Sequence, residues 1–241
     1  MFTHYNTESI ILKKENLREA DQLFTVYTRD FGKLEILGKA IRKIQSKLRS
    51  GADIFYLSKI EFIQGKRYKT LTDAILIDKF KNIRENLERL KIAYRISEVL
   101  DNLIKGQEVD EKTWHLLNEV FKKLNNLQFA ICNLQLIYYY FFWNFLSILG
   151  YQLELYKCFA CQKKLTPEEL YFSQKEAGIV CSACFKKMKN AERIEASTIK
   201  VLRVLYKKDW TVLKRLRLKE TDLNLLEEVS DNYLSAILNQ G

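Results

Sequence analysis

The sequence contains few of the residues on which catalysis and flexible linkers depend. It has one proline among its 241 residues, and no low-complexity linker divides it. Its two histidines, His4 and His115, lie far apart, and it has neither a glycine-rich phosphate loop nor a Gly-x-Ser-x-Gly motif. Its carboxylates show no spacing that would pair them. We therefore expect a protein that is not an enzyme.

The first residues also lack the features of a signal peptide. Residues 1–8 have no basic start and no small-residue cleavage site, and no transit-like segment follows them. We therefore expect a cytoplasmic protein.

Charge of either sign is absent from residues 124–153, although 29% of the sequence is Asp, Glu, Lys or Arg. This stretch predicts a central buried helix that ends in a left-handed C-cap at Gly150. Its length would also permit a transmembrane span. However, polar side chains spread along it would lack partners in lipid: Gln128, Asn133, Gln135, Asn144 and Ser147. We expect a core helix and no membrane partner.

The overall composition favours a folded protein with an anionic partner. A hydrophobic fraction of 47% excludes a disordered chain, and the length suits one large domain or two to three small ones. The formal net charge of +10 favours nucleic acid or a membrane surface as a partner. A basic balance that only keeps the protein soluble is the alternative.

The first third of the chain predicts strands. Five segments are rich in β-branched and aromatic residues: 9–13, 22–28, 33–41, 54–63 and 68–77. Residues 30–32 and 64–66 are the expected hairpin turns. Alternate residues of the third segment share one face, and its glycine suits a bend in a small closed sheet: Leu34, Ile36, Gly38 and Ala40. Five strands in roughly seventy residues predict an OB-type barrel, although an SH3-like barrel or a three-layer sheet fits the same spacing.

After Asp78 the apolar residues recur at helical spacing. Two stripes precede the uncharged stretch: Phe80, Ile83, Leu87, Leu90 and Tyr94, then Trp114, Leu117, Phe121 and Leu124. Two stripes follow residue 196: Ile199, Leu202 and Tyr206, then Leu223, Leu226, Val229, Tyr233 and Leu238. Gly106 is expected to separate the first helices. We predict an α+β protein with an OB domain (1–79), a helical domain (80–154 and 191–241) and an embedded metal module (155–190).

Four of the five cysteines form two Cys-x-x-Cys pairs separated by nineteen residues: Cys158 and Cys161, then Cys181 and Cys184. Each pair directs two thiolates to one point, and two pairs complete a tetrahedron, with a hairpin of residues 170–172 and 178–180 between them. In a reducing compartment this pattern favours metal over disulfides. We predict a structural Zn²⁺; free or redox-active thiols and an iron–sulfur cluster are alternatives. Cys132 is expected to be a core residue.

Basic residues predict a DNA-binding surface on the barrel. Residues 36–52 contain no acid and five basic residues: Lys39, Arg42, Lys43, Lys47 and Arg49. The turn after residue 64 adds three more: Lys66, Arg67 and Lys69. Such charges displace counterions from phosphates, and nearby aromatic rings stack on bases. A solvated loop without function is the alternative. Residues 186–219, with twelve basic and three acidic residues, either extend this surface or form a solvated helix face.

Several segments together resemble the RecO family of bacterial recombination mediators. Residues 9–13, 19–33, 38–43 and 46–48 resemble its amino-terminal OB domain, and residues 145–151 followed by the first cysteine pair resemble its helix end and zinc entry. The resemblance covers essentially the whole chain in order. The chain departs from the family in two turns, because Gln152-Leu153 stands where a proline is common and Gln162 where a glycine is usual. Neither change removes a ligand.

The resemblance implies an OB fold, a helical domain, an embedded zinc module and a role that is not enzymatic. It implies binding of single- and double-stranded DNA and annealing of complementary strands. It also implies that the protein acts with RecR and single-stranded-DNA-binding protein to load the recombinase RecA. The expected location is the cytoplasm, in association with the nucleoid. Composition alone would fit an RNA-binding or ribosome-associated OB and zinc protein equally well.

Overall fold

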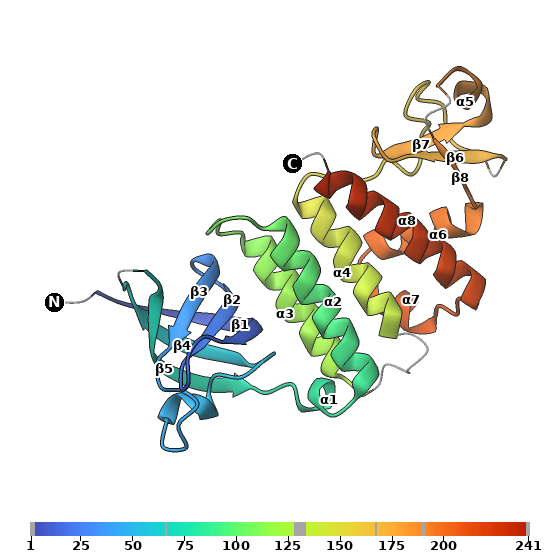
Figure 1. Cartoon of the computed structure of the whole chain (residues 1–241). Helices are drawn as coiled ribbons and strands as arrows, with labels where there is room; N and C mark the ends of the chain where they lie inside the picture. Colours follow the sequence, from blue (N-terminus) through green and yellow to red (C-terminus); the bar gives the residue numbers. More distant parts are fainter. Residues whose placement is uncertain (1–2, 66, 128–133, 167, 189–190, 240–241) are drawn as a thin grey trace. The chain divides into compact units, whose positions relative to one another are not determined.

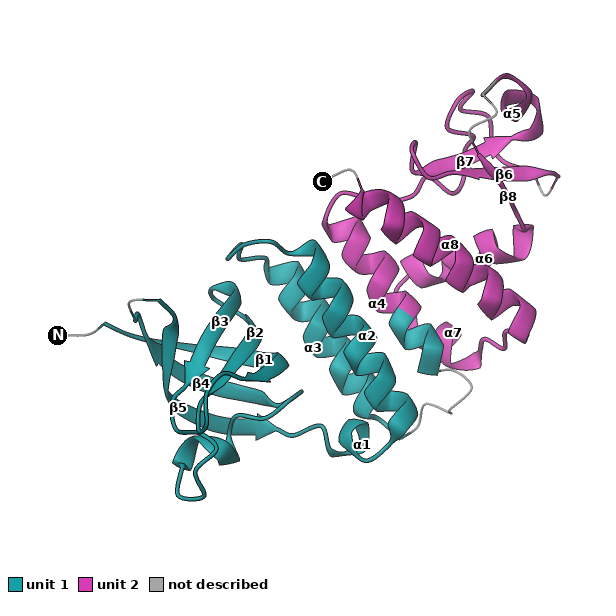
Figure 2. Cartoon of the chain, viewed as in Figure 1, with its two compact units in different colours: residues 1–138 teal, residues 139–241 magenta. Residues whose placement is uncertain are grey.

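The computed structural model describes residues 3–65, 67–127, 134–166, 168–188 and 191–239 (Figure 1). The chain divides into two compact units, Met1–Tyr138 and Tyr139–Gly241, so the boundary falls within one helix, α4 (Figure 2). The first unit holds the strands β1 to β5 and the helices α1 to α3. The division into three domains at residues 79, 154 and 190 stays a prediction.

Five strands close into a barrel in the order β1-β2-β3-β5-β4. They are β1 (His4–Asn16), β2 (Gln22–Thr28), β3 (Gly32–Gly38), β4 (Leu57–Ile63) and β5 (Lys69–Asp78). The β3–β5 pair is parallel and short, whereas the other pairs are antiparallel. A register shift between Ile11 and Lys13 lets β1 pair with β4 through its first half and with β2 through its second half. This arrangement confirms the predicted OB-type barrel and the α+β fold class.

Alternate strand residues fill the barrel. The buried apolar side chains inside it form one cluster: Ile11, Phe24, Val26, Leu34, Ile36, Ile41, Ala52, Ile60, Phe62, Leu71 and Ala74. Phe62 belongs to this cluster, and its ring is stacked on Tyr5 at 5.4 Å and edge-on to Phe31 at the same distance. The cluster explains why hydrophobic alternation in the sequence located the strands.

Two details at the ends of β3 differ from or extend the prediction. The strand ends at Gly38, so Ala40 is not on its face; Ala40 has φ 52° and its N–H donates to the Asp21 carboxylate at 2.7 Å. At the other end, the predicted hairpin turn at residues 30–32 is confirmed. Gly32 has φ +64°, and a Cβ there would lie 2.2 Å from the Glu108 carbonyl oxygen. Only glycine fits both constraints. Of the second predicted turn, Lys66 lies outside the described residues.

The first helical stripe is wrong in part. The chain forms a short helix, α1 (Lys81–Arg84), and the helical conformation is then interrupted. The next helix, α2 (Leu87–Leu103), starts after Asn86, whose side chain accepts a hydrogen bond from the Arg89 N–H. Leu87 and Tyr94 are therefore 65% and 50% exposed. The buried face of α2 instead includes Arg89, Ile92, Ile96 and Leu100. Arg89 is satisfied there because its guanidinium donates to the Leu124 and Asn126 carbonyl oxygens.

The second stripe is confirmed. In α3 (Glu111–Asn125), Trp114, Leu117, Phe121 and Leu124 are all buried, and Asp110 caps the helix at its first turn. The segment around Gly106 separates α2 from α3, as expected.

The uncharged stretch does not form one helix. Its first residues end α3, and α4 (Leu134–Ile148) contains its buried centre, so the prediction of one helix over 124–153 is wrong, although a buried core helix is confirmed. Asn144 donates to the carbonyl oxygens of Tyr140 (2.8 Å) and Leu205 (3.2 Å). Gly150 has φ +93°, and the Tyr151 N–H donates to the Leu146 carbonyl oxygen at 2.8 Å. These two features confirm the predicted C-cap.

Some expectations for this stretch fall outside the described residues, namely those for Gln128, Cys132 and Asn133. Among the helices that the structure describes, none combines the length and the apolar character needed to cross a bilayer.

The second unit combines helices with a small sheet. The helices after α4 are α5 (Ser182–Met188), α6 (Ala196–Tyr206), α7 (Trp210–Arg215) and α8 (Glu220–Leu238). The sheet has the order β7-β6-β8, from β6 (Leu170–Ser173), β7 (Gly178–Cys181) and β8 (Glu192–Ile194). Trp143 of α4 stacks on Tyr233 of α8 at 5.6 Å. The stripe predicted for α8 is correct in part. Leu226 and Tyr233 are buried, Leu223 and Val229 are half-buried, and Ile237 is buried where Leu238 was expected.

Candidate metal centre and nucleic-acid interface

The four paired cysteines meet at one point. Cys158 and Cys161 lie in a turn that precedes β6, whereas Cys181 ends β7 and Cys184 lies in α5. The sulfur atoms all lie within 4.8 Å of one another, and the sulfurs of Cys161 and Cys181 are 3.9 Å apart. Four sulfurs at a Zn–S distance of about 2.3 Å in a tetrahedron would be roughly 3.8 Å apart. This group could therefore hold a metal ion.

Backbone hydrogen bonds shape the first cysteine turn, which we define as residues 156–164. The Cys158 N–H donates to the Lys163 carbonyl oxygen, and the Gln162 N–H donates to the Cys158 carbonyl oxygen, both at 2.8 Å. Gln162 has φ +59°, which glycine adopts more easily. The resemblance placed the family's usual glycine at this position. The turn geometry is thus retained at some strain in this chain.

The predicted hairpin between the pairs is confirmed. Strands β6 and β7 are antiparallel, with Leu170 opposite Cys181, so the hairpin carries the second pair to the first. In addition, the Phe159 N–H donates to the Ile179 carbonyl oxygen at 2.8 Å. These bonds tie the first cysteine turn to β7.

The thiols differ in acidity. Burial of Cys158 opposes its ionisation, but the backbone N–H groups of Cys181, Cys161 and Ala160 point at its sulfur and lower the pKa to about 6. Hydrogen bonds with the thiols of Cys181 and Cys161 raise the pKa of Cys184 to about 12. A metal binds thiolates, so metal binding there would release the protons of those thiols that are still protonated.

The basic loop of the barrel, residues 39–49, connects β3 to the short 3₁₀ helix η1 (Lys47–Ser50) and to the chain that leads to β4. All five of its predicted DNA-binding side chains are exposed: Lys39, Arg42, Lys43, Lys47 and Arg49. Arg42 holds the loop in place. Its backbone N–H donates to the Ala20 carbonyl oxygen (3.0 Å), and its guanidinium donates to the Glu19 carbonyl oxygen (2.9 Å).

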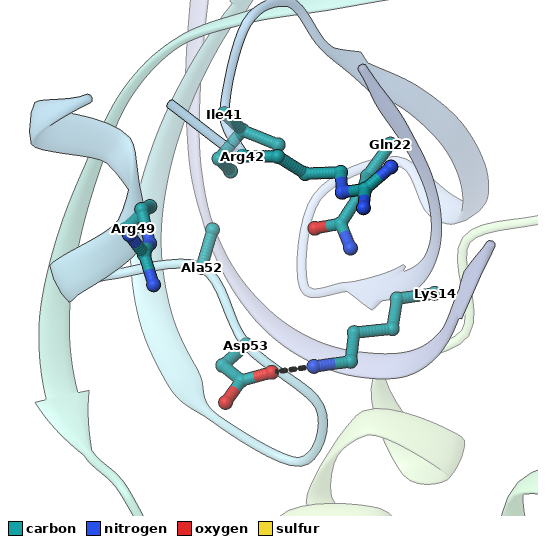
Figure 3. Close-up of a pocket in the computed structure, with 7 residues that line it drawn as sticks. All are labelled: Lys14, Gln22, Ile41, Arg42, Arg49, Ala52 and Asp53. Carbon is teal, nitrogen blue, oxygen red and sulfur yellow. Dashed lines mark hydrogen bonds and ion pairs between the residues drawn. The ribbon is translucent and has the colours of Figure 1, made fainter. Parts of the chain in front are cut away.

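Both arginines of the basic loop, Arg42 and Arg49, line a pocket of about 300 Å³ together with three further polar residues (Figure 3). Its lining is Lys14, Gln22, Ile41, Arg42, Arg49, Ala52 and Asp53. We call it the loop pocket. Three cations face one carboxylate in it, so the pocket favours an anion such as a backbone phosphate.

Asp53 organises one side of the loop pocket. It forms ion pairs with Lys14 and, at 2.6 Å, with Arg84, whose guanidinium also donates to the Ile54 carbonyl oxygen. Burial opposes ionisation of Asp53, but the hydrogen bonds from Lys14 and Arg84 outweigh burial and hold its pKa below the usual value. Lys14 therefore serves the fold. Arg49 is exposed, and Arg42 uses one guanidinium nitrogen for the Glu19 carbonyl oxygen, so its other N–H groups can meet a ligand.

The second predicted basic group lies elsewhere on the barrel. Arg67 and Lys69 line a separate pocket of about 400 Å³, which shares no lining residue with the loop pocket. Lys33 of β3 and Lys105, which follows α2, also line it. Lys33 is paired with Asp101 at 2.9 Å. The structure thus does not bring all the predicted residues to one pocket, and Lys66 lies outside the described part of the chain.

Sequence reasoning missed Lys14, Lys33 and Lys105 as pocket residues. None lies in a basic run, and only the pairing of strands and the path of the chain after α2 bring them to these pockets. The basic residues of 186–219 are spread over α5, β8, α6, α7 and their connections. They do not form the face of one helix.

Comparison with known proteins covers both units. Residues 1–80 match the family described as Recombination protein O N terminal, and residues 84–240 match Recombination protein O C terminal. The chain is 29% identical over 237 residues to the DNA repair protein RecO of Moorella thermoacetica, with 98% of this chain and 87% of that protein covered. It is 29% identical over 223 residues to the DNA repair protein RecO of Dehalococcoides mccartyi, covering 92% and 86%.

The first match spans the five strands of the barrel, and the second spans the four cysteines and the helices from α2 to α8. The resemblance read from the sequence motifs is confirmed. The chain belongs to the RecO family.

Proposed function

We propose that this protein is a DNA-binding recombination mediator that anneals complementary single strands and assists recombinase loading in recombinational DNA repair. The observation that carries the proposal is the family match, which runs through the barrel and the helices alike. Relatives that cover nearly all of the chain are named DNA repair proteins. The role requires no catalytic group, so we expect no metal-dependent turnover of DNA.

The barrel is the proposed DNA-binding domain. Its exposed basic loop and loop pocket suit the sequence-independent contacts that annealing demands, because phosphates are the same in every strand. Annealing also requires release of the product. Contacts from separate exposed cations weaken steeply with salt and exchange readily, which favours that release. The proposed contact residues are Lys39, Arg42, Lys43, Lys47, Arg49, Lys66, Arg67 and Lys69.

We propose Zn²⁺ as the metal of the four-cysteine group. Four thiolates in tetrahedral array suit zinc or an iron–sulfur cluster, and the closed ligand set leaves no position for substrate. Its role would be structural, holding a module of roughly residues 155–190 between two parts of a helical domain, 80–154 and 191–241. The barrel, at 1–79, would form the third domain.

The proposed partners are RecR and the single-stranded-DNA-binding protein, and the proposed location is the cytoplasm at the nucleoid. These follow from the family alone. An annealing assay tests the function: two complementary oligonucleotides are coated with the cognate single-stranded-DNA-binding protein, and duplex formation is followed by energy transfer. We expect the protein to accelerate annealing. If the rate is unchanged, while the protein binds structured RNA tightly, the proposal is wrong.

A further inference from the structure

The first cysteine turn presents aromatic rings and lysines but no carboxylate. Its sequence is Tyr-Lys-Cys-Phe-Ala-Cys-Gln-Lys-Lys. Tyr156 is 54% exposed and Phe159 is 38% exposed. Three lysines of the turn are also exposed: Lys157, Lys163 and Lys164. The surface of the turn is therefore both aromatic and positively charged.

The lysines carry charge that the fold does not neutralise. Lys157 and Lys164 lie directly opposite each other in an antiparallel bridge, and like charges in that position destabilise a hairpin. Within the described part of the chain, none of the three lysines forms an ion pair. The nearby Glu154 carboxylate instead accepts the N–H groups of Tyr156 (2.7 Å) and Lys157 (3.1 Å). An anionic ligand would remove this repulsion.

The two rings are held in place on one side. Phe159 packs against Gly178, where an added Cβ would come within 3.2 Å of the Phe159 Cβ, and its N–H is bonded to β7. The guanidinium of Arg203 lies 4.6 Å from the centre of the Tyr156 ring and also donates to the Leu155 carbonyl oxygen at 3.0 Å. Rings that are already ordered lose little conformational entropy when a base stacks on them.

We propose that the first cysteine turn is a second DNA-binding surface, specific for single strands. Bases stack on Phe159 and Tyr156, and phosphates contact Lys157, Lys163 and Lys164. Single-stranded DNA is favoured because bases in a duplex are stacked on each other and offer no free face to an aromatic side chain. This inference rests on the DNA-binding function proposed above and assigns part of it to the metal module.

The test uses the full-length, metal-loaded protein, with fluorescein-labelled oligothymidylate and a labelled duplex as probes. Phe159→Ala should lower affinity for the single strand about fivefold to about a hundredfold and leave duplex affinity unchanged. Phe159→Leu keeps an apolar side chain beside Gly178 but has no ring, so it should show the same loss. Metal content and thermal unfolding of both variants establish that the turn is intact.

A second variant tests the phosphate contacts. Replacing Lys157, Lys163 and Lys164 by Gln should flatten the slope of log affinity against log salt by about 2.1 on the single strand, at about 0.7 per phosphate contact. The matched control replaces Lys112, Lys122 and Lys175 by Gln. All three side chains are exposed and lie outside the proposed DNA-binding residues, and the control variant loses the same charge. The control should keep the parental slope.

The outcomes separate this inference from the proposed function. If the parent binds both probes, and both Phe159 variants hold their metal and bind the single strand with parental affinity, the inference is wrong and the proposed function stands. Equal losses on single strand and duplex also overturn it, since stacking would then not be the contact. If the parent binds neither probe, the proposed function itself fails.

Discussion

The barrel and the four-cysteine module differ in the length of their strands and in the core that those strands can enclose. The barrel closes on itself and encloses a cluster of buried apolar side chains from all five strands. The two strands within the module have only four residues each, and their hairpin ends at a cysteine. Small segments with little core usually require a metal or disulfides to stay folded. Apolar burial accounts for the barrel, and we expect the fold of the module to depend on a metal bound by its cysteines.

Removal of one cysteine should have the largest effect. Cys181→Ser should release the metal and expose roughly residues 155–190, because structural zinc contributes on the order of 10 kcal/mol to the folding of such modules. Metal analysis and hydrogen–deuterium exchange measure both effects. Exchange in β1 to β5 should stay at the parental rate. Cys132→Ser, which changes the cysteine outside the four, should keep one metal per chain. One equivalent of metal in Cys181→Ser would contradict this assignment.

A core substitution in the barrel should have the opposite pattern. Phe62→Ala should lower the free energy of unfolding by about 3–5 kcal/mol, since Phe62 is fully buried between Tyr5 and Phe31. Exchange in the strands should rise while metal content stays at the parental value. The control is Ile75→Ala on β5, which is 58% exposed and should cost less than about 0.5 kcal/mol. Loss of metal on Phe62→Ala would show that the two regions depend on each other.

Acid should weaken the barrel through Asp53. Its pKa is below the unfolded value, so its stabilisation is fully present above the unfolded pKa and is lost as the pH falls through the folded pKa. Asp53→Asn should remove that part of the pH dependence and cost about 1–3 kcal/mol near neutral pH. Denaturant unfolding of parent and variant at a series of pH values measures both. Two curves that stay parallel into acid would rule out Asp53 as the group responsible.

The basic loop should have the smallest effect on stability and a clear effect on binding. Replacing Arg42 and Arg49 by Gln should flatten the salt slope for single-stranded DNA by about 1.4. Loss of two surface charges and of the Arg42 hydrogen bond to the Glu19 carbonyl oxygen should lower the free energy of unfolding by only about 1 kcal/mol. Lys112→Gln with Lys122→Gln, on exposed positions of α3, provides the charge-matched control. An unchanged slope in a folded Arg42 and Arg49 variant would mean that the loop is only solvated.

The strands and the cysteine pairs that were predicted correctly are those that a short stretch of sequence determines. The strand at β2 was predicted from seven neighbouring residues and is confirmed, and each Cys-x-x-Cys pair spans four residues. The two pairs meet as expected, in a group that could hold a metal ion. The stripe from Phe80 to Tyr94 was wrong at Leu87 and Tyr94, because the helix break at Asn86 depends on a cap and not on hydrophobicity. Arg89 is buried because carbonyl oxygens at the end of α3 accept its hydrogen bonds, and a sequence pattern does not contain that distant contact.

The uncharged stretch shows a second limit of sequence patterns. Where nearly every residue is uncharged, no change in period marks the end of one helix, so the end of α3 at Asn125 went unnoticed. No sequence pattern indicated the two pockets either. Lys33 and Lys105 meet Arg67 only because the chain after α2 returns to the barrel, where it packs against Gly32.

The pairing of β1 with both β2 and β4 constrains how the barrel is made during synthesis. Ser9 pairs with Ser58, 49 positions later. At roughly 5–20 residues per second, the ribosome delivers that partner about 2–10 seconds after the first half of β1. During this interval the hairpin of β2 and β3 can form, but one edge of β1 remains unpaired and open to other nascent chains. Slower translation between residues 16 and 57 would lengthen that exposure, so the yield of folded protein should depend on codon choice in this segment.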